Sequence, residues 1–249
     1  MNRGRPFGYL PFKVGDYLLQ RAAIAVVIVV FIAGVPLYGV LHGNPAFFTT
    51  ADGPAMAKQL FTNSITLFLP MGAFLGGTGI ISSDRQQGHF RFLFSKPVNV
   101  VSYYVQTYLI HGVVFVALFG LITWVYGAAT VHQPIRGAMA AAALTFALVG
   151  GLGFFFGALT RFDGVLVALT YLVSMTLQQV AVVPGSRPLP VWTVHLARIL
   201  PPVYPLDQLR EQLFAAQTVD SGRLWYVLAY GLALFLLGLL ALRALPLTR

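Results

Sequence analysis

Six long apolar runs constrain the fold of this 249-residue chain more than any other feature of its sequence. Each run has roughly 20 residues, the length that a helix needs to cross a hydrocarbon core about 30 Å thick. Backbone groups inside lipid must bond within their own segment, so the runs predict helices and not strands. The predicted spans are residues 22–41, 60–81, 103–128, 137–160, 165–183 and 224–245.

The composition agrees with a membrane location. Hydrophobic residues make up 57% of the chain and charged residues 9%, whereas a soluble domain has roughly 25% charged residues. The formal net charge is +9, but the basic residues lie between the apolar runs, which favours topology signals and anionic lipid over nucleic acid. The absence of cysteine excludes disulfides and thiolate metal sites. We therefore expect an all-α polytopic membrane protein with one transmembrane domain over residues 1–249.

The distribution of basic residues predicts the topology. If the N-terminus is inside, the cytoplasmic segments hold ten of the sixteen lysines and arginines. These ten are Arg3, Arg5, Lys13, Arg21, Arg85, Arg91, Lys96, Arg161, Arg243 and Arg249. Because short cytoplasmic loops are enriched in basic residues, this count places both termini in the cytoplasm.

Two segments outside the spans should also be helical. Residues 9–21 mix aromatic and charged side chains, as a helix lying in the cytoplasmic interface does. The outer segment 184–223 is too long for a simple turn. Within it, residues 191–200 and 205–216 predict two short helices, the second with Pro205 at its start and leucines along one face.

Spans two and four are rich in glycine. Span two contains Gly72, Gly76 and Gly79, and span four contains Gly153 and Gly157. Small residues at such spacing let helices approach closely. We expect these five glycines to serve helix packing or a dimer interface.

The spans carry almost no ionisable groups, which a membrane enzyme or an ion-coupled pump would need. His111 is the exception, and we expect it to bond one helix to another rather than to relay protons. The five histidines of the chain are too scattered for a metal site, and no Gly-Lys dipeptide exists to form a phosphate-binding P-loop. We predict no catalytic, cofactor or metal site, so any transport must draw its energy from a partner.

The loop at residues 82–100, between spans two and three, is the most informative stretch. Asp84 and Arg85 end the span, Gly88 loosens the chain and Pro97 stops the following short helix. That helix would carry Phe90, Leu93 and Phe94 on one face. An apolar face directed to the cytoplasm suits docking into a groove on another protein, and lying on the lipid surface would suit it about equally.

This loop resembles the corresponding loop of the ABC type-2 transporter permeases, the membrane subunits of ATP-binding-cassette exporters. Asp84, Arg85, Gly88, Leu93 and Pro97 match the pattern of that family. Residues 188–210 resemble its paired extracellular helices before the last span. The chain departs from many relatives in having Asp rather than Glu at position 84. It also has no segment long enough for a large periplasmic domain, which argues against the mechanotransducing branch of exporters.

The resemblance implies a permease dimer, identical or paired with a paralogue, bound to two cytoplasmic ABC ATPase subunits. It also implies that residues 84–97 form a coupling loop, which would pass the closure of the ATPase to the spans. Its ATPase-coupling residues would be Asp84, Arg85, Gly88, Phe90, Leu93, Phe94 and Pro97. ATP and Mg would bind to the ATPase partner, and spans one, two and five would line the dimer interface in the cell inner membrane. Apolar spans suit a hydrophobic or amphiphilic cargo moved out of the cytoplasm. Two other classes stay open: a membrane scaffold that does not transport, and an intramembrane enzyme with His111 as its one candidate catalyst.

Overall fold

A computed structural model describes residues 15, 53–87, 99–129, 132–182 and 190–244 of the chain. Regular secondary structure among these residues is entirely helical. Within these ranges, five helical segments are long and apolar enough to cross a membrane: Ala57–Gly77, Val100–Ala128, Ile135–Leu159, Asp163–Ala181 and Ser221–Ala244. The chain is therefore a multi-pass membrane protein. The predicted interfacial helix 9–21, span 22–41 and loop residues 88–98 lie outside the described residues.

The helices follow the predicted order. The long ones are α3 (Gly53–Gly77), α6 (Val100–Ala129), α9 (Asp163–Val182) and α12 (Ser221–Ala244), together with a segment in three parts, α7 (Ile135–Thr145), η1 (Phe146–Gly150) and α8 (Gly151–Leu159). The short ones are α4 (Ser82–Gln87), α10 (Val191–Ile199) and α11 (Val203–Phe214). The two predicted outer helices, 191–200 and 205–216, thus correspond to α10 and α11, although α11 begins two residues earlier, at Val203.

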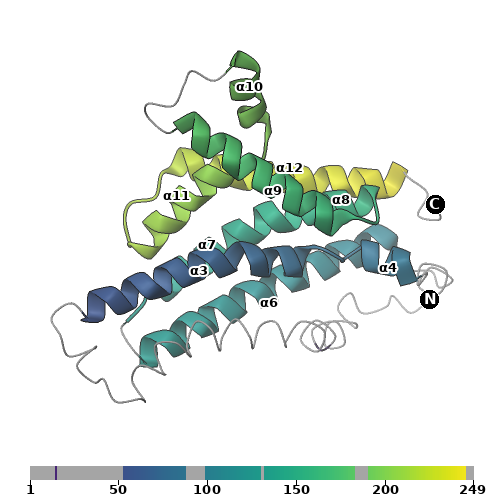
Figure 1. Ribbon diagram of the computed structural model, residues 1–249. Helices are drawn as coiled ribbons and strands as arrows, with labels where there is room; N and C mark the ends of the chain where they lie inside the picture. The colour runs from purple at the N-terminus through teal and green to yellow at the C-terminus, as the bar shows by residue number, and fades with distance from the viewer. Residues whose placement is uncertain (1–14, 16–52, 88–98, 130–131, 183–189, 245–249) are drawn as a thin grey trace.

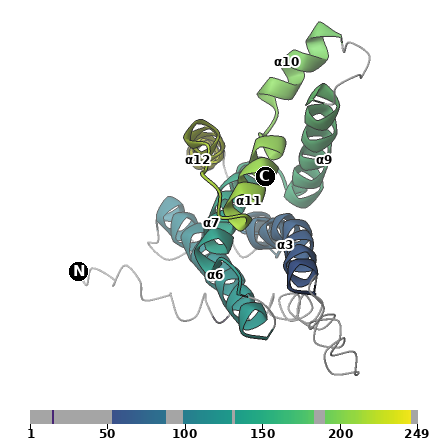
Figure 2. The ribbon, with the colours of Figure 1, turned by 90° about the vertical axis from the view of Figure 1, so that its left-hand side faces the viewer.

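The segment Ile135–Leu159 forms the centre of the bundle. Two thirds of its spanning residues are buried (67%), against 33% or less in the other four. α7 packs on α6, η1 on α3 and α12, and α8 along α12 (Figure 1). Seen from the end, α9 and α12 lie on opposite sides of α11 (Figure 2). The remaining apolar surface, such as Leu67 and Val113, faces outward, as lipid contact requires.

The central segment is not the uniform α-helix that the sequence predicts over 137–160. Five residues from Phe146 to Gly150 form a π-helix, a wide turn that interrupts α-helical register. Glycines lie at the close contacts between this part of the segment and its two neighbouring helices. A Cβ at Gly77 would lie 2.5 Å from Gly150 Cα, and a Cβ at Gly151 would lie 2.6 Å from the Gly231 carbonyl oxygen. The π-helix thus lies where α3 and α12 approach its backbone most closely.

The second span also ends earlier than predicted. α3 stops at Gly77 rather than at residue 81, and residues 78–81 form a turn before α4. Gly79 adopts a φ of 79°, in the left-handed region that a residue with a Cβ rarely occupies. The apolar run 60–81 hides this break because Ile80 and Ile81 are buried in the turn, at 6% and 1% exposure.

Candidate functional site

The candidate site is the junction around α4, which is the first part of the predicted loop 82–100. It comprises residues 79–87, the start of α6 and the turn between α8 and α9. Figure 1 places α4 at the same end of the bundle as the end of α8. We refer to this group of segments as the α4 junction.

Asp163 accepts three hydrogen bonds in the α4 junction. It is the first residue of α9 and is 5% exposed. Its Oδ2 accepts a hydrogen bond from the Gly79 backbone N–H at 2.8 Å, and its Oδ1 accepts one from the Ser82 hydroxyl at 2.8 Å. Its Oδ1 also accepts the Gly164 N–H at 2.9 Å. A carboxylate held by three donors is well suited to fixing the α3–α4 turn against α9 and poorly suited to abstracting a proton.

Two polar side chains of α4 bind the turn between α8 and α9. Arg85 donates from Nη2 to the Ala158 carbonyl oxygen at 2.8 Å, and Gln86 donates from Nε2 to the Arg161 carbonyl oxygen at 3.0 Å. The last carbonyls of a helix lack intrahelical partners and carry partial negative charge. Arg85 therefore caps the end of α8, while burial of its guanidinium lowers the Arg85 pKa.

Asp84 connects the junction to α6. Its Oδ2 accepts a hydrogen bond from the Tyr104 hydroxyl at 3.0 Å, and Tyr104 is fully buried. The two residues of the acidic-basic pair, predicted to begin the coupling loop, thus contact different helices. Asp84 binds α6 and Arg85 binds α8, so a displacement of α4 must move or break contacts with both helices.

The other predicted coupling residues, Gly88, Phe90, Leu93, Phe94 and Pro97, lie outside the described residues. They follow directly on α4, which ends at Gln87. The α4 junction therefore directly precedes the predicted docking helix in the chain.

The predicted packing glycines take several positions within the chain. A Cβ at Gly72 would lie 2.9 Å from the Phe115 ring, and a Cβ at Gly153 would lie 2.6 Å from the Gly77 carbonyl oxygen. A Cβ at Gly157 would lie 3.4 Å from Asp163 Oδ2, in ordinary contact. Gly79 forms the turn described above. These contacts are within one chain, and a role for these glycines between two chains stays a prediction.

His111 bridges two helices, as its isolation in the sequence led us to expect. Its Nδ1 lies 3.0 Å from the carbonyl oxygen of Gly76. Since a carbonyl oxygen only accepts, this ring nitrogen is the donor. The bond ties α6 to the last turn of α3, close to the α4 junction.

A second polar cluster at the far end of α9 escaped the sequence analysis. Gln178 is 8% exposed, and its Nε2 donates to the carbonyl oxygens of Ala197 at 3.1 Å and Pro201 at 2.9 Å. Its Oε1 accepts the Tyr204 backbone N–H at 2.9 Å. One amide thus fixes α9 to the end of α10 and the start of α11. The adjacent residue, Gln179, is exposed, and composition alone cannot distinguish the two.

Arg210, within the predicted outer helix 205–216, is the largest fully buried side chain among the residues that the structure describes. It is 2% exposed and lies on the inner face of α11 with Leu206 and Leu209. It pairs with Asp207 one turn earlier and interacts with Tyr171 of α9. Burial lowers the Arg210 pKa. The signal in the sequence is the spacing of residues 206, 209, 210 and 213, which puts the arginine on the apolar stripe.

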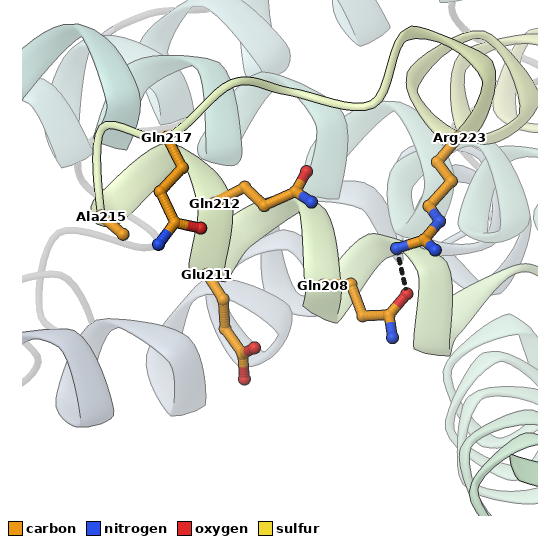
Figure 3. A pocket seen from close by; sticks show the side chains of 6 residues that line it. All are labelled: Gln208, Glu211, Gln212, Ala215, Gln217 and Arg223. Carbon is orange, nitrogen blue, oxygen red and sulfur yellow. Dashed lines mark hydrogen bonds between the residues drawn. The ribbon is translucent and has the colours of Figure 1, made fainter.

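A shallow polar hollow of about 330 Å³ lies on the other side of α11. Figure 3 shows its lining: Gln208, Glu211 and Gln212 of α11, Ala215 and Gln217 beyond it, and Arg223 of α12. Arg223 donates from Nη1 to Gln208 Oε1 at 2.6 Å. Broad exposure and mixed polarity give this hollow the character of a wetted surface rather than of a ligand site.

No group of three histidine or acidic side chains is placed to hold a metal ion within the ranges that the structure describes. In comparisons with known proteins, neither a protein-family model nor a curated protein matches the sequence.

Proposed function

We propose that this chain is the transmembrane permease subunit of an ABC exporter, which moves a hydrophobic or amphiphilic substrate out of the cytoplasm. ATP and Mg belong to a separate cytoplasmic ATPase subunit in this proposal. The proposal rests on the resemblance of the loop 82–100 and of the outer helices to ABC type-2 permeases. The α4 junction with both chain termini would lie on the cytoplasmic side of the inner membrane.

The observation that carries the proposal is the bonding of α4. A coupling loop must deliver force to several spans at once, and α4 is held to α9 by Asp163, to α8 by Arg85 and to α6 by Asp84. A loop that only covered the lipid surface would need no such connections to three helices. The partner ATPase would therefore act on residues 88–97, and α4 would distribute the movement.

A permease also requires a second copy, identical or paralogous, to form the path. The exposed apolar faces of α3 and α9, with Leu67 and Leu169 at 62% and 54% exposure, offer contact surface for such a copy or for lipid. A largely apolar membrane surface agrees with an apolar or amphiphilic cargo.

The test is copurification of the tagged chain from its native membrane, with recovered ATP hydrolysis as the readout. Replacing Phe90, Leu93 and Phe94 together with Ser should leave the protein inserted but abolish recovery of the ATPase. The matched control replaces exposed Trp192 and Ile199 of α10, at the opposite end, with Ser.

The control variant should retain the ATPase. Equal recovery from both variants would refute the assignment of the docking helix. Failure to recover any ATPase with the unmodified chain would favour a scaffold over a transporter.

A further inference from the structure

Side-chain hydrogen bonds attach helix α9 to its neighbours near both of its ends, and Tyr171 at its middle interacts with Arg210 of α11. At its first residue, Asp163 binds Gly79 and Ser82 of the α4 junction. Fifteen residues later, Gln178 binds the backbone of Ala197, Pro201 and Tyr204. At about 1.5 Å per residue, these two attachment points lie about 22 Å apart along the helix.

Between these ends α9 packs along one narrow stripe. Only 17% of its spanning residues are buried. Val167 and Ser174 have no exposed surface and share a face with Asp163 and Gln178, whereas Leu169 and Leu172 on the opposite faces are 54% and 58% exposed. A helix with few apolar contacts along its length can shift relative to its neighbours at little cost in packing. The hydrogen bonds of Asp163 and Gln178 near its ends, and the interaction of Tyr171 with Arg210 between them, connect it to particular neighbouring segments.

The hydrogen bonds of Asp163 and Gln178 would be costly to break. Asp163 makes two hydrogen bonds to the α4 junction and Gln178 makes three to the α10–α11 segment, and an unpaired buried donor or acceptor costs about 1–3 kcal/mol. Pulling α9 away from either end would leave several such groups without partners. The helix itself runs unbroken from Asp163 to Val182 and contains no proline.

We infer that Asp163 and Gln178 are positioning residues that make α9 a rigid connection between the α4 junction and the α10–α11 segment on the other side of the membrane. Displacement of α4 is passed to α9 at Asp163 and to the start of α11 at Gln178. This inference goes beyond the proposed function, because it concerns coupling inside the chain and does not require an ATPase or a cargo.

The test is amide hydrogen exchange of the full chain in lipid nanodiscs, with Gln178→Leu compared against Gln179→Leu. Both variants lose a glutamine amide from the same turn, but only Gln178 bonds α10 and α11. Loss of about one net hydrogen bond makes local opening of the backbone roughly fivefold more frequent. Amide exchange in residues 197–206 should therefore accelerate about fivefold or more. The inference additionally requires about twofold or greater acceleration in residues 78–87, at the other end of α9. The Gln179→Leu variant should match the unmodified chain at both ends.

The reciprocal variant covers the case in which Gln178→Leu fails to fold. Asp163→Asn retains the size and one acceptor oxygen, and it should accelerate exchange in residues 78–87 and also in residues 197–206, because coupling is reciprocal. Acceleration confined to the end that carries the substitution would overturn the inference, and so would unchanged exchange at both ends. Since neither ATPase nor substrate is present, this result is independent of the copurification test.

Discussion

The contact between Gly153 and α3 gives a sharp test of the packing. In Gly153→Ala, the new Cβ would lie 2.6 Å from the Gly77 carbonyl oxygen and 2.8 Å from its carbon. These are backbone atoms, so no side chain can rotate away to make room. Because ordinary contact begins near 3.4 Å, α8 and α3 would have to separate by about 0.8 Å in a close-packed region.

Overpacking costs about 1–3 kcal/mol, and a clash with backbone atoms belongs to the upper part of this range, about 2–3 kcal/mol. The higher helix propensity of alanine returns about 1 kcal/mol. A net loss of about 1–2 kcal/mol should lower the midpoint of thermal unfolding by about 2–8 °C for a chain of this size. Unfolding in detergent can be followed by tryptophan fluorescence, since Trp124, Trp192 and Trp225 are far from the substitution in sequence.

Gly157→Ala is the matched control, one turn further along α8. Its Cβ would meet Asp163 Oδ2 at 3.4 Å and Ile81 Cβ at 3.6 Å, which is normal contact distance. This variant should unfold within about 1 °C of the unmodified chain or slightly above it. Equal losses in the two variants, or a stable Gly153→Ala protein, would refute the close approach of α8 to α3.

Three further substitutions test the polar connections. Tyr104→Phe removes the 3.0 Å bond to Asp84 and should cost about 1–2 kcal/mol of unfolding free energy, measured by denaturant titration in micelles. Asp207→Ala leaves the Arg210 guanidinium buried without its carboxylate and should cost about 3–5 kcal/mol, whereas Asp207→Leu combined with Arg210→Met should recover most of that loss. If the chain is the proposed permease, a folded His111→Gln protein should still transport in proteoliposomes, and loss of transport with unchanged stability would favour the alternative of an intramembrane enzyme.

The sequence predicts the long elements well because their physical signal is strong. Apolar runs of membrane length leave few alternatives to a helix, so the segments that became α6, α9 and α12 could be located within a few residues. The break after Gly77 was not visible, since buried isoleucines continue the apolar run through the turn. The π-helix at Phe146–Gly150 was equally hidden, because it depends on how α3 and α12 pack against that segment.

In the candidate site too, the sequence predicts local features but not contacts between distant segments. The motif around Asp84 and Arg85 marks where the loop begins, but it gives no sign that each residue binds a different helix. Asp163 lies in a short connection between spans, and its partners Gly79 and Ser82 are more than 80 residues away. Such contacts follow from tertiary packing, which residue spacing within one segment does not encode.

The most direct test of the central claim is site-specific photo-crosslinking in native membranes. The chain contains no cysteine, so a benzophenone label can be attached at Arg161→Cys, beside α4, or at Trp192→Cys, on α10. Both positions are exposed. If the α4 junction receives the ATPase, the label at position 161 should crosslink a nucleotide-hydrolysing subunit and the label at position 192 should not. Crosslinking of that subunit from position 192 alone, or from neither position, would contradict the account.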